Sequence, residues 1–273
     1  IVKQVNVPIV ADIHFNYGFA LKSIEAGVAK VRINPGNIGK VERIKKVLSA
    51  AKEREIPIRI GVNSGSLEQD ILEKHGFPTD EALYESAMRH VGIAKDFGFD
   101  DVVVSVKSTS VPLMISAYRL IAERTDIPLH LGVTEAGRMR VGTIKSSVGI
   151  GTLLAEGIGD TIRVSLTDEP EKEVEVGQEI LRSLGLAQRN VEIISCPTCG
   201  RLDVDLFKIT EELEKATKDI KKPMTVSVLG CAVNGPGEAR EADLGVAAGK
   251  GQGILFKKGK HFKTVKEHEI IDE

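Results

Sequence analysis

The sequence predicts an α/β fold, a TIM-like (β/α) barrel with six of its eight βα units present, followed by a small C-terminal α/β domain. Short β-rich runs alternate with longer amphipathic stretches up to about residue 186. Repeated strand–helix units form parallel strands with right-handed crossovers, and a closed barrel needs eight of them. The chain opens in what reads as the tail of a helix, Ile1–Val5, so we expect the first two units to be missing. A doubly wound open sheet is the alternative, but it would leave two apolar edge strands.

Six strands and the helices between them account for the barrel in chain order. The stretch Val41–Glu55 has apolar residues at near-helical spacing. Thr79 is placed to cap a helix over Thr79–Phe97, and Pro170 to begin one over Glu169–Leu184. The predicted strands are Ile9–Phe15, Lys30–Asn34, Pro57–Asn63, Asp101–Ser108, Leu129–Thr134 and Thr161–Leu166.

A short polar stretch near Ala187–Asn190 predicts a domain boundary, with residues 1–188 in the barrel and 189–273 in the second domain. The second domain is too short for another barrel and suits a small α/β unit. Its predicted elements are a strand over Val191–Ser195, a helix over Asp205–Ile220 and a strand over Met224–Leu229, before a glycine-rich stretch to Gly259.

The composition excludes several classes of protein. The 39 acidic side chains nearly balance the 37 basic ones, which argues against a nucleic-acid binder. No run of about 18 apolar residues is present to cross a membrane. The 3 cysteines all lie in the last third, an odd count that is unlike a secreted disulfide framework. We therefore expect a protein of the reducing cytoplasm.

The alternation of residues within the strands predicts an anion-binding site. Side chains point to opposite faces with a period of two, and the apolar set must face the helices. The polar set then points into the barrel and includes a cation from four of the six strands: Arg32, Arg59, Lys107 and Arg163. Buried unpaired cations are costly, and internal acids such as Asp12 and Glu135 offset only part of that cost. A phosphate or diphosphate would supply the rest, because arginine offers forked donors to it. Pairing with buried carboxylates, or exposure at the rim, is the alternative.

Other polar features of the barrel predict less. His14 and His130 share the polar face, but each is as well explained as a hydrogen-bonded structural histidine. The segment Gly149–Gly151 lacks the spacing of a dinucleotide fingerprint, so we reject that interpretation.

The three cysteines predict a soft metal centre. Cys196 and Cys199 form a C-x2-C pair, and Cys231 follows in GCAVNGPGE. Such thiolates favour zinc or an iron–sulfur cluster. No histidine has ligand spacing, and Glu238 is the nearest fourth candidate. A carboxylate is a hard ligand that should exchange readily, which suits an iron atom that opens to a substrate oxygen. A structural zinc site and a redox dithiol with an unrelated third cysteine remain alternatives.

At these residues the chain resembles a known family. The segments ADIHF, RINPGNIG, IRIGVNSGSL, VSVKS, LHLGVTEAG, EGIGDTIRVSL, CPTCGR and GCAVNGPGE occur in order over nearly the whole chain. Together they resemble the bacterial 4-hydroxy-3-methylbut-2-enyl diphosphate synthases, the iron–sulfur enzymes of the methylerythritol phosphate route to isoprenoids. Members of that family carry further N-terminal residues, which would supply the two missing strands.

The resemblance implies a flavodoxin- or ferredoxin-dependent oxidoreductase. Its reaction is the two-electron reductive ring opening of 2-C-methyl-D-erythritol 2,4-cyclodiphosphate with loss of water. The family works as a head-to-tail homodimer in which one protomer's cluster domain caps its partner's barrel. Glu135 would be the acid/base candidate, and Glu238 the ligand that the substrate displaces. The remaining implied ligands are Cys196, Cys199, Cys231 and Glu238 for a [4Fe–4S] cluster, and Arg32, Arg59, Asn63, Lys107, Arg163 and Ser165 for the cyclic diphosphate.

Two other functions are compatible with these residues. One is a phosphate-binding barrel aldolase or synthase whose second domain holds a structural zinc ion. The other is a non-catalytic iron–sulfur scaffold or sensor, which the four inward cations disfavour. The metal content separates the first from the cluster enzyme, and binding of the cyclic diphosphate separates the second.

Overall fold

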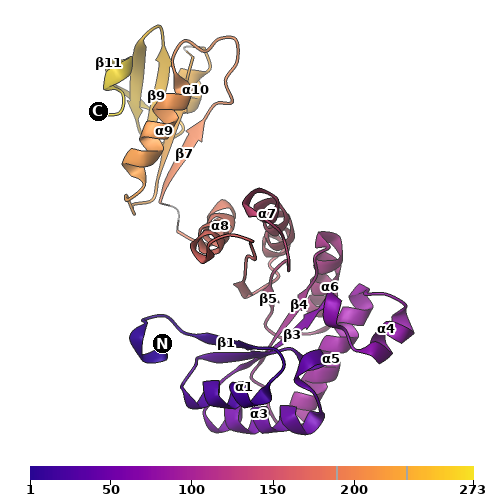
Figure 1. Cartoon of the computed structure of the whole chain (residues 1–273). Helices are drawn as coiled ribbons and strands as arrows, with labels where there is room; N and C mark the ends of the chain where they lie inside the picture. The colour runs from indigo at the N-terminus through magenta and orange to yellow at the C-terminus, as the bar shows by residue number, and fades with distance from the viewer. Residues whose placement is uncertain (189, 232) are drawn as a thin grey trace. The chain divides into compact units, whose positions relative to one another are not determined.

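Parallel strand pairing in chain order organises the first part of the molecule. The computed structural model describes residues 1–188, 190–231 and 233–273 (Figure 1). The chain divides into two compact units, Ile1–Leu184 and Gly185–Glu273. The functional roles predicted for residues 1–188 and 189–273 remain predictions at this point.

The first unit is built on six parallel strands, each at a position that the sequence predicts. The strands β1 to β4 form one sheet in the order β1-β2-β3-β4. A parallel bridge between Val104 and Leu129 continues it to β5, which pairs in parallel with β6. Sequential order is typical of a barrel wall and not of a doubly wound sheet, whose order reverses. The bounds are β1 (Val10–Ile13), β2 (Lys30–Ile33), β3 (Ile58–Asn63), β4 (Val102–Lys107), β5 (His130–Leu131) and β6 (Thr161–Ile162).

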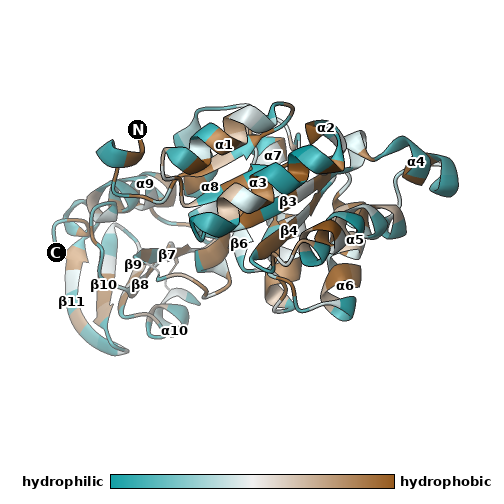
Figure 2. Ribbon diagram, turned by 90° about the horizontal axis from the view of Figure 1, so that it is seen from below, coloured by the Kyte–Doolittle hydropathy of each residue, from teal (hydrophilic) through white to brown (hydrophobic). Residues whose placement is uncertain are grey.

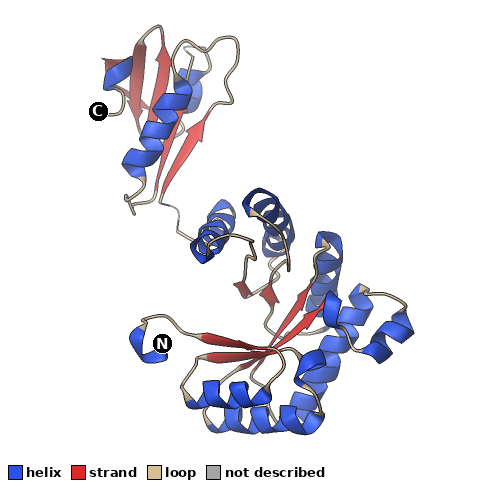
Figure 3. Ribbon diagram, in the orientation of Figure 1, coloured by secondary structure: helices blue, strands red, loops and turns tan. Residues whose placement is uncertain are grey.

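Helices connect the strands and cover their outer side, and α1, α3 and α5 lie along one side of β1 to β4 in Figure 3. Successive helices pack on one another, as α5 does on α6 and α7 on α8. The predicted cap is confirmed, because Thr79 Oγ1 accepts a hydrogen bond of 3.0 Å from Ala82 N. The bounds are α1 (Tyr17–Glu25), α2 (Pro35–Ile38), α3 (Val41–Glu53), α4 (Gln69–His75), α5 (Asp80–Asp96), α6 (Val111–Arg124), α7 (Met139–Ala155) and α8 (Pro170–Ser183). Short 3-10 turns lie at η1 (Val2–Gln4), where the sequence predicts a helix tail, and at η2 (Ser64–Ser66).

The apolar face of each strand forms the core of this unit. Val31, Ile58 and Val104 have no exposed surface and pack in one cluster with the helices. Figure 2 shows brown and teal faces along α3, as expected for a helix with one side on the sheet. Burial of such side chains contributes about 25 cal/mol per Å² of apolar surface. The predicted alternation is therefore confirmed, and it leaves the polar residues of the strands on the opposite, inner face.

A buried tyrosine joins β4 to β5, where the strand pairing is thin. Tyr118 on α6 is fully buried. Its hydroxyl accepts a hydrogen bond of 3.1 Å from Val106 N and donates one of 2.5 Å to His130 O. Desolvation raises the pKa of this hydroxyl, so it stays a neutral donor. The contact fixes the strands that carry Lys107 and His130.

The second unit is a five-stranded mixed sheet in the order β11-β10-β9-β8-β7. Strands β7, β8 and β9 are parallel, and β10 and β11 add to them in antiparallel fashion. The predicted strands over Val191–Ser195 and Met224–Leu229 match β7 and β8, and Asp205 caps the predicted helix through Lys208 N. The bounds are β7 (Val191–Ser195), α9 (Leu206–Thr217), β8 (Met224–Leu229), α10 (Gly235–Ala239), β9 (Leu244–Gly249), β10 (Gln252–Lys257), β11 (Lys260–Lys266) and a 3-10 turn η3 (Glu267–Glu269).

The strands β9 and β10 lie in the glycine-rich stretch of this unit, and the sequence pattern did not predict them. Both strands end in tight turns, Lys250–Gly251 and Lys258–Gly259, in which all four residues have positive φ. Such turns match the twist of a hairpin and explain the glycines. None of the described helices is long and apolar enough to cross a membrane.

Candidate functional site

Strand register brings the predicted cations of the barrel together. Arg32 on β2 is paired with Arg59 on β3 and with Asp12 on β1. Lys107 on β4 lies opposite Asn63 on β3. These strand residues are on the polar face, so they converge on the inner side of the barrel towards the carboxyl ends of the strands. Arg163, which follows β6, joins them through Asp12. We call the set Asp12, Arg32, Arg59, Lys107 and Arg163 the cationic bowl.

Arg32 is held in place by partners on both neighbouring strands. Its Nη1 donates hydrogen bonds of 2.7 Å to Asp12 Oδ1 and 3.0 Å to His14 Nε2. Its Nη2 donates one of 3.3 Å to Gly61 O. The guanidinium lies across Gly61, where an added Cβ would come within 2.2 Å of Arg32 Nε. Glycine is required at this position of β3 because only hydrogen leaves room for Arg32.

Arg59 and Lys107 are buried without a counter-ion of their own. They are 8% and 6% exposed, and among the described residues neither has a carboxylate within 4.0 Å. Arg59 Nε is buried and has no hydrogen-bond partner. Burial, with the nearby charges of Arg163, Arg59 and Arg32, lowers the pKa of Lys107 to about 7. Burial likewise lowers the pKa of Arg59. A bound anion would therefore reduce the free-energy cost of burying these two positive charges.

Asp12 links the two sides of the bowl. Its Oδ1 accepts from Arg32, and its Oδ2 lies 3.7 Å from Nη1 of Arg163, which follows β6. Burial acts to raise the pKa of Asp12, but the charge and hydrogen bond of Arg32 outweigh it and hold the pKa below its usual value. The carboxylate is thus charged near neutral pH. Ser165 lies two residues beyond Arg163 and is partly buried.

A polar cavity of about 290 Å³ opens at the carboxyl ends of the strands. Three residues singled out from the sequence line it: His14, Asn63 and Glu135. Glu135 has a φ of 52°, a conformation that few residues other than glycine adopt. Asn63 Oδ1 is buried and has no hydrogen-bond partner. The other lining residues are Asn34, Asn37, Ser64, Gly65, Ser66, Thr109 and Thr134.

His130 is deeper and electrically neutral. Burial and the nearby Arg59 and Lys107 lower its pKa to about 2. Its Nδ1 is 2.8 Å from Thr161 Oγ1, so a structural hydrogen bond is present. Its Nε2 is buried and has no partner. A neutral imidazole at this depth can accept or donate a hydrogen bond but cannot serve as a proton donor at neutral pH.

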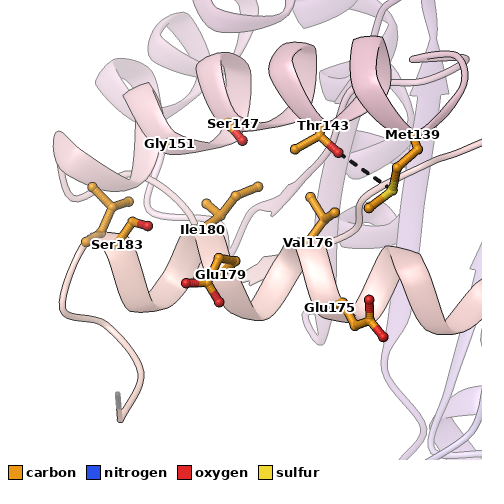
Figure 4. Close-up of a pocket in the computed structure, with 10 residues that line it drawn as sticks. Met139, Thr143, Ser147, Gly151, Glu175, Val176, Glu179, Ile180 and Ser183 are labelled. Atoms are coloured by element: carbon orange, nitrogen blue, oxygen red, sulfur yellow. Dashed lines mark hydrogen bonds between the residues drawn. The ribbon is translucent and has the colours of Figure 1, made fainter. Parts of the chain in front are cut away.

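A larger cavity lies elsewhere, between α7 and α8. It has a volume of about 400 Å³, and Met139 and Thr143 face Val176 and Ile180 across it (Figure 4). Its lining is apolar for the most part and includes none of the predicted site residues. The chemistry of the barrel is therefore at its strand ends and not in this groove.

The three cysteines gather at one edge of the second unit. Cys196 follows the end of β7, and Cys231 follows the end of the neighbouring parallel strand β8. The loop with Cys199 turns back along β8, because Asp203 N donates to Gly230 O at 3.3 Å. Cys196 is partly buried, Cys199 exposed and Cys231 buried, and all three are free thiols. Glu238 is exposed on the short helix α10.

Two of these thiols lie near hydrogen-bond donors. Arg201 lowers the pKa of Cys199, and the backbone N–H groups of Asn234, Val233 and Gly235 lower that of Cys231. Thiolate character suits a soft metal ion. The described residues nevertheless include no group of three or more His, Cys, Asp or Glu side chains already close enough to hold one. The donor set fits a thiolate-bound centre in kind and in strand-end placement, but its members are not assembled.

The sequence interpretation omitted several residues from the site. Asp12 on β1 was predicted only to offset part of the cationic charge, and His14, which follows β1, only to be a structural histidine, so neither was included among the ligand-binding residues. The amides and hydroxyls of the polar cavity come from loops, where no periodicity identifies them. Only the meeting of the loops at one end of the barrel reveals them.

The fold and the site together define a TIM-barrel protein with a cationic bowl, joined to a second α/β unit with three free thiols. Two family models match this chain, the GcpE TIM-barrel domain over residues 1–178 and the GcpE protein C-terminal domain over residues 192–273. The chain belongs to the GcpE family.

Curated relatives share more than half of their aligned residues with this chain. One from Caldanaerobacter subterraneus subsp. tengcongensis is 59% identical over 99% of this chain and 76% of its own length. One from Clostridium acetobutylicum is 59% identical over 100% of this chain and 78% of its own. One from Thermodesulfovibrio yellowstonii is 55% identical over 99% and 77%. Each is named 4-hydroxy-3-methylbut-2-en-1-yl diphosphate synthase (flavodoxin).

Proposed function

We propose that this protein is a flavodoxin-dependent 4-hydroxy-3-methylbut-2-enyl diphosphate synthase. It reductively opens 2-C-methyl-D-erythritol 2,4-cyclodiphosphate, consumes two electrons and releases water. The observation that carries the proposal is the convergence of Arg32, Arg59, Lys107 and Arg163 on one face of the barrel. Membership of the GcpE family supplies the reaction class.

The bowl binds the diphosphate of the substrate. Arg59 Nε and the Lys107 ammonium are buried donors without a counter-ion. A phosphate oxygen supplies the negatively charged hydrogen-bond acceptor that they lack. Arg32 and Arg163 add forked donors from two further strands. Ser165 follows Arg163 on the same face and contributes a hydroxyl. Binding energy from the remote diphosphate then orients the carbon–oxygen bond that breaks.

The polar cavity receives the carbon skeleton of the substrate. Asn63 has an unpartnered amide oxygen there, which accepts a substrate hydroxyl. Glu135 is the acid/base group, because it is exposed on the rim of the same cavity and can exchange protons with solvent. Its left-handed backbone fixes the direction of the carboxyl group. The hydroxyl that leaves as water takes its proton from this side.

A [4Fe–4S] cluster is the redox group that we assign to the second unit. Cys196, Cys199, Cys231 and Glu238 would hold it, since Cys196 and Cys231 follow adjacent strand ends, Cys199 is in the loop beside them and the carboxylate is exposed on the next helix. When bound, such a cluster supplies electrons one at a time and offers an iron site as a Lewis acid. Glu238 would be a weak, exchangeable ligand of that centre, because a carboxylate is a hard ligand on a soft site.

The wider arrangement follows the family. We propose that the six units of the barrel belong to an eight-unit barrel, and that the protein works as a head-to-tail homodimer in the cytoplasm. Electrons come from flavodoxin, which the names of the relatives specify, or from a ferredoxin.

Metal analysis and turnover test the proposal together. Protein purified without oxygen should be brown, absorb broadly near 400 nm and contain iron and acid-labile sulfide in equal amounts. With reduced flavodoxin it should convert the cyclic diphosphate to the linear one. A colourless protein with one zinc ion per chain would favour a barrel aldolase or synthase with a structural zinc site. Intact iron and sulfide without binding of the cyclic diphosphate in calorimetry would favour a scaffold.

A further inference from the structure

Asp12 stands out in the bowl because it is the one acidic residue in the six described strands of the first unit. It sits among cations from four other strands or strand ends, Arg32, Arg59, Lys107 and Arg163. One oxygen pairs with Arg32 at 2.7 Å, and the other lies 3.7 Å from Arg163. It therefore bridges β2 and the segment after β6, which belong to different sheets.

The same two arginines are the groups that a diphosphate would engage. Arg32 is buried, with a side chain 6% exposed, and its remaining partners are the His14 ring and Gly61 O. A carboxylate and a phosphate oxygen use the same fork of guanidinium donors. Arg32 Nη1 is committed to Asp12 when no ligand is present, so ligand and Asp12 compete for it.

We propose that Asp12 is a positioning residue that acts as a built-in counter-ion, holding Arg32 and Arg163 ready and releasing them to the diphosphate as it binds. This inference rests on the proposed function, because it needs a diphosphate in the bowl. Asp12 touches neither the reacting carbon–oxygen bond nor the cysteine site in this account. It acts through the two arginines.

The electrostatics of the bowl explain why a counter-ion is needed. Burial lowers the pKa of Lys107 and of Arg59, and the charges of the neighbouring cations lower both further. Removing the partner of a buried charge destabilises a fold more than the pair itself stabilises it. Loss of the Asp12 charge should therefore weaken the ligand-free protein. It should also leave the bowl with one more unneutralised cation, which an incoming anion can use.

The test is thermal unfolding with inorganic diphosphate as the probe, on the whole protein. The variant Asp12→Asn should unfold at a lower temperature than the wild type without ligand. Saturating diphosphate should raise its midpoint further than that of the wild type, and its diphosphate affinity should rise about tenfold. The variant Asp12→Glu retains the charge and should restore most of the wild-type behaviour.

A matched control comes from the surface of the same unit. Asp70 accepts two hydrogen bonds from Arg89, at 3.0 and 2.6 Å, far along the chain from the bowl. Asp70→Asn should lower the midpoint slightly and leave the response to diphosphate unchanged. An equal diphosphate response in Asp12→Asn, Asp70→Asn and wild type would overturn the counter-ion role. Absence of any response in the wild type would overturn the diphosphate site itself, and the counter-ion role with it.

Two further readouts remain informative if Asp12→Asn does not fold. A crystal structure of the wild-type protein with inorganic diphosphate should show the Arg32 Nη1 to Asp12 Oδ1 contact opened from 2.7 Å to beyond hydrogen-bond range. A retained contact beside a bound diphosphate would contradict the exchange. In turnover assays of a folded Asp12 variant, KM and kcat should both fall, since the substrate binds tightly to arginines that are no longer aligned. A change in KM alone would exclude a positioning role.

Discussion

The two units of this chain prepare their sites in opposite ways. In the barrel, Arg32, Arg59 and Lys107 are buried on adjacent strands, and hydrogen bonds to Asp12 and Gly61 hold Arg32 in place. In the second unit, the thiols sit at strand ends and in a loop, and the described residues form no ready-made metal cage. A strand can hold a long cation rigidly, whereas ligands on loops need the metal to draw them together. The bowl should therefore still bind an anion when the cysteine site is damaged. Turnover should need both sites.

The largest effect should come from removing one cysteine. Cys231→Ser should abolish the cluster and turnover, because Cys231 is the buried thiol that follows β8. Binding of inorganic diphosphate should remain within about twofold of the wild-type affinity, since the bowl is built by the other unit. Iron content, turnover and calorimetry measure the three quantities. Loss of diphosphate binding in this variant would show that the two sites are not independent.

Closing the fourth corner of the cysteine site should have the next largest effect. Glu238→Cys should retain iron and sulfide, because a thiolate is a better ligand for a soft centre than a carboxylate. Turnover should be lost or severely reduced, because the substrate oxygen can no longer replace the ligand. The neighbouring Glu241→Cys is the matched control, as it lies outside α10 and should leave turnover intact. Near-normal activity of Glu238→Cys would refute the open-iron role.

Removing a buried cation should lower the affinity of the bowl for an anion. It should also remove the free-energy cost of burying that charge. Lys107→Met should lower the affinity for diphosphate by about 10- to 100-fold, as expected when one partner of a buried charge contact is lost. The exposed Lys215→Met, which loses only a helical ion pair with Glu211, is the control and should bind diphosphate normally. Calorimetry with inorganic diphosphate measures both.

The same variant should change the pH dependence of stability. The pKa of Lys107 is about 7 in the folded chain and 10.5 in its ordinary state, so between these values the unfolded chain binds more protons. The free energy of unfolding of the wild type should therefore gain a positive slope from this group as pH rises from about 7 to 10.5. Lys107→Met should remove that contribution, and Lys215→Met should not. Parallel curves for the wild type and Lys107→Met in denaturant titrations across this range would contradict the buried position of the ammonium.

A smaller change should come from the glycine beneath Arg32. In Gly61→Ala the added Cβ would lie within 2.2 Å of Arg32 Nε, so the guanidinium must move. We expect about a tenfold loss of diphosphate affinity, equivalent to about 1.4 kcal/mol. Gly92→Ala on α5 is the control, because nothing lies within 4 Å of its Cβ position and it lines neither the bowl nor the polar cavity. Equal affinities of the two variants would mean that Arg32 does not need its present position to bind the anion.

Much of the barrel could be read from the sequence because its signal is local. Alternation in β2, β3 and β4 assigned Arg32, Arg59 and Lys107 to the inner face, and the structure confirms that these side chains lie together. The predicted strands over Leu129–Thr134 and Thr161–Leu166 were longer than β5 and β6, which pair with each other over only two residues each, while a single bridge links this pair to β4. The turns that bound β10 were not assigned as hairpins, because glycine-rich segments fit several turn geometries.

The sequence by itself determined the order of the strands, the inward cations and the spacing of the three cysteines. These features depend on periodicity and on side-chain chemistry, which each segment carries with it. Only the tertiary structure decided that Asp12 bridges Arg32 and Arg163, that Arg32 lies across Gly61, and that loop amides and hydroxyls share a cavity with Glu135. Contacts of this kind join residues from separate strands and loops, so their energies depend on packing distances that no local pattern specifies.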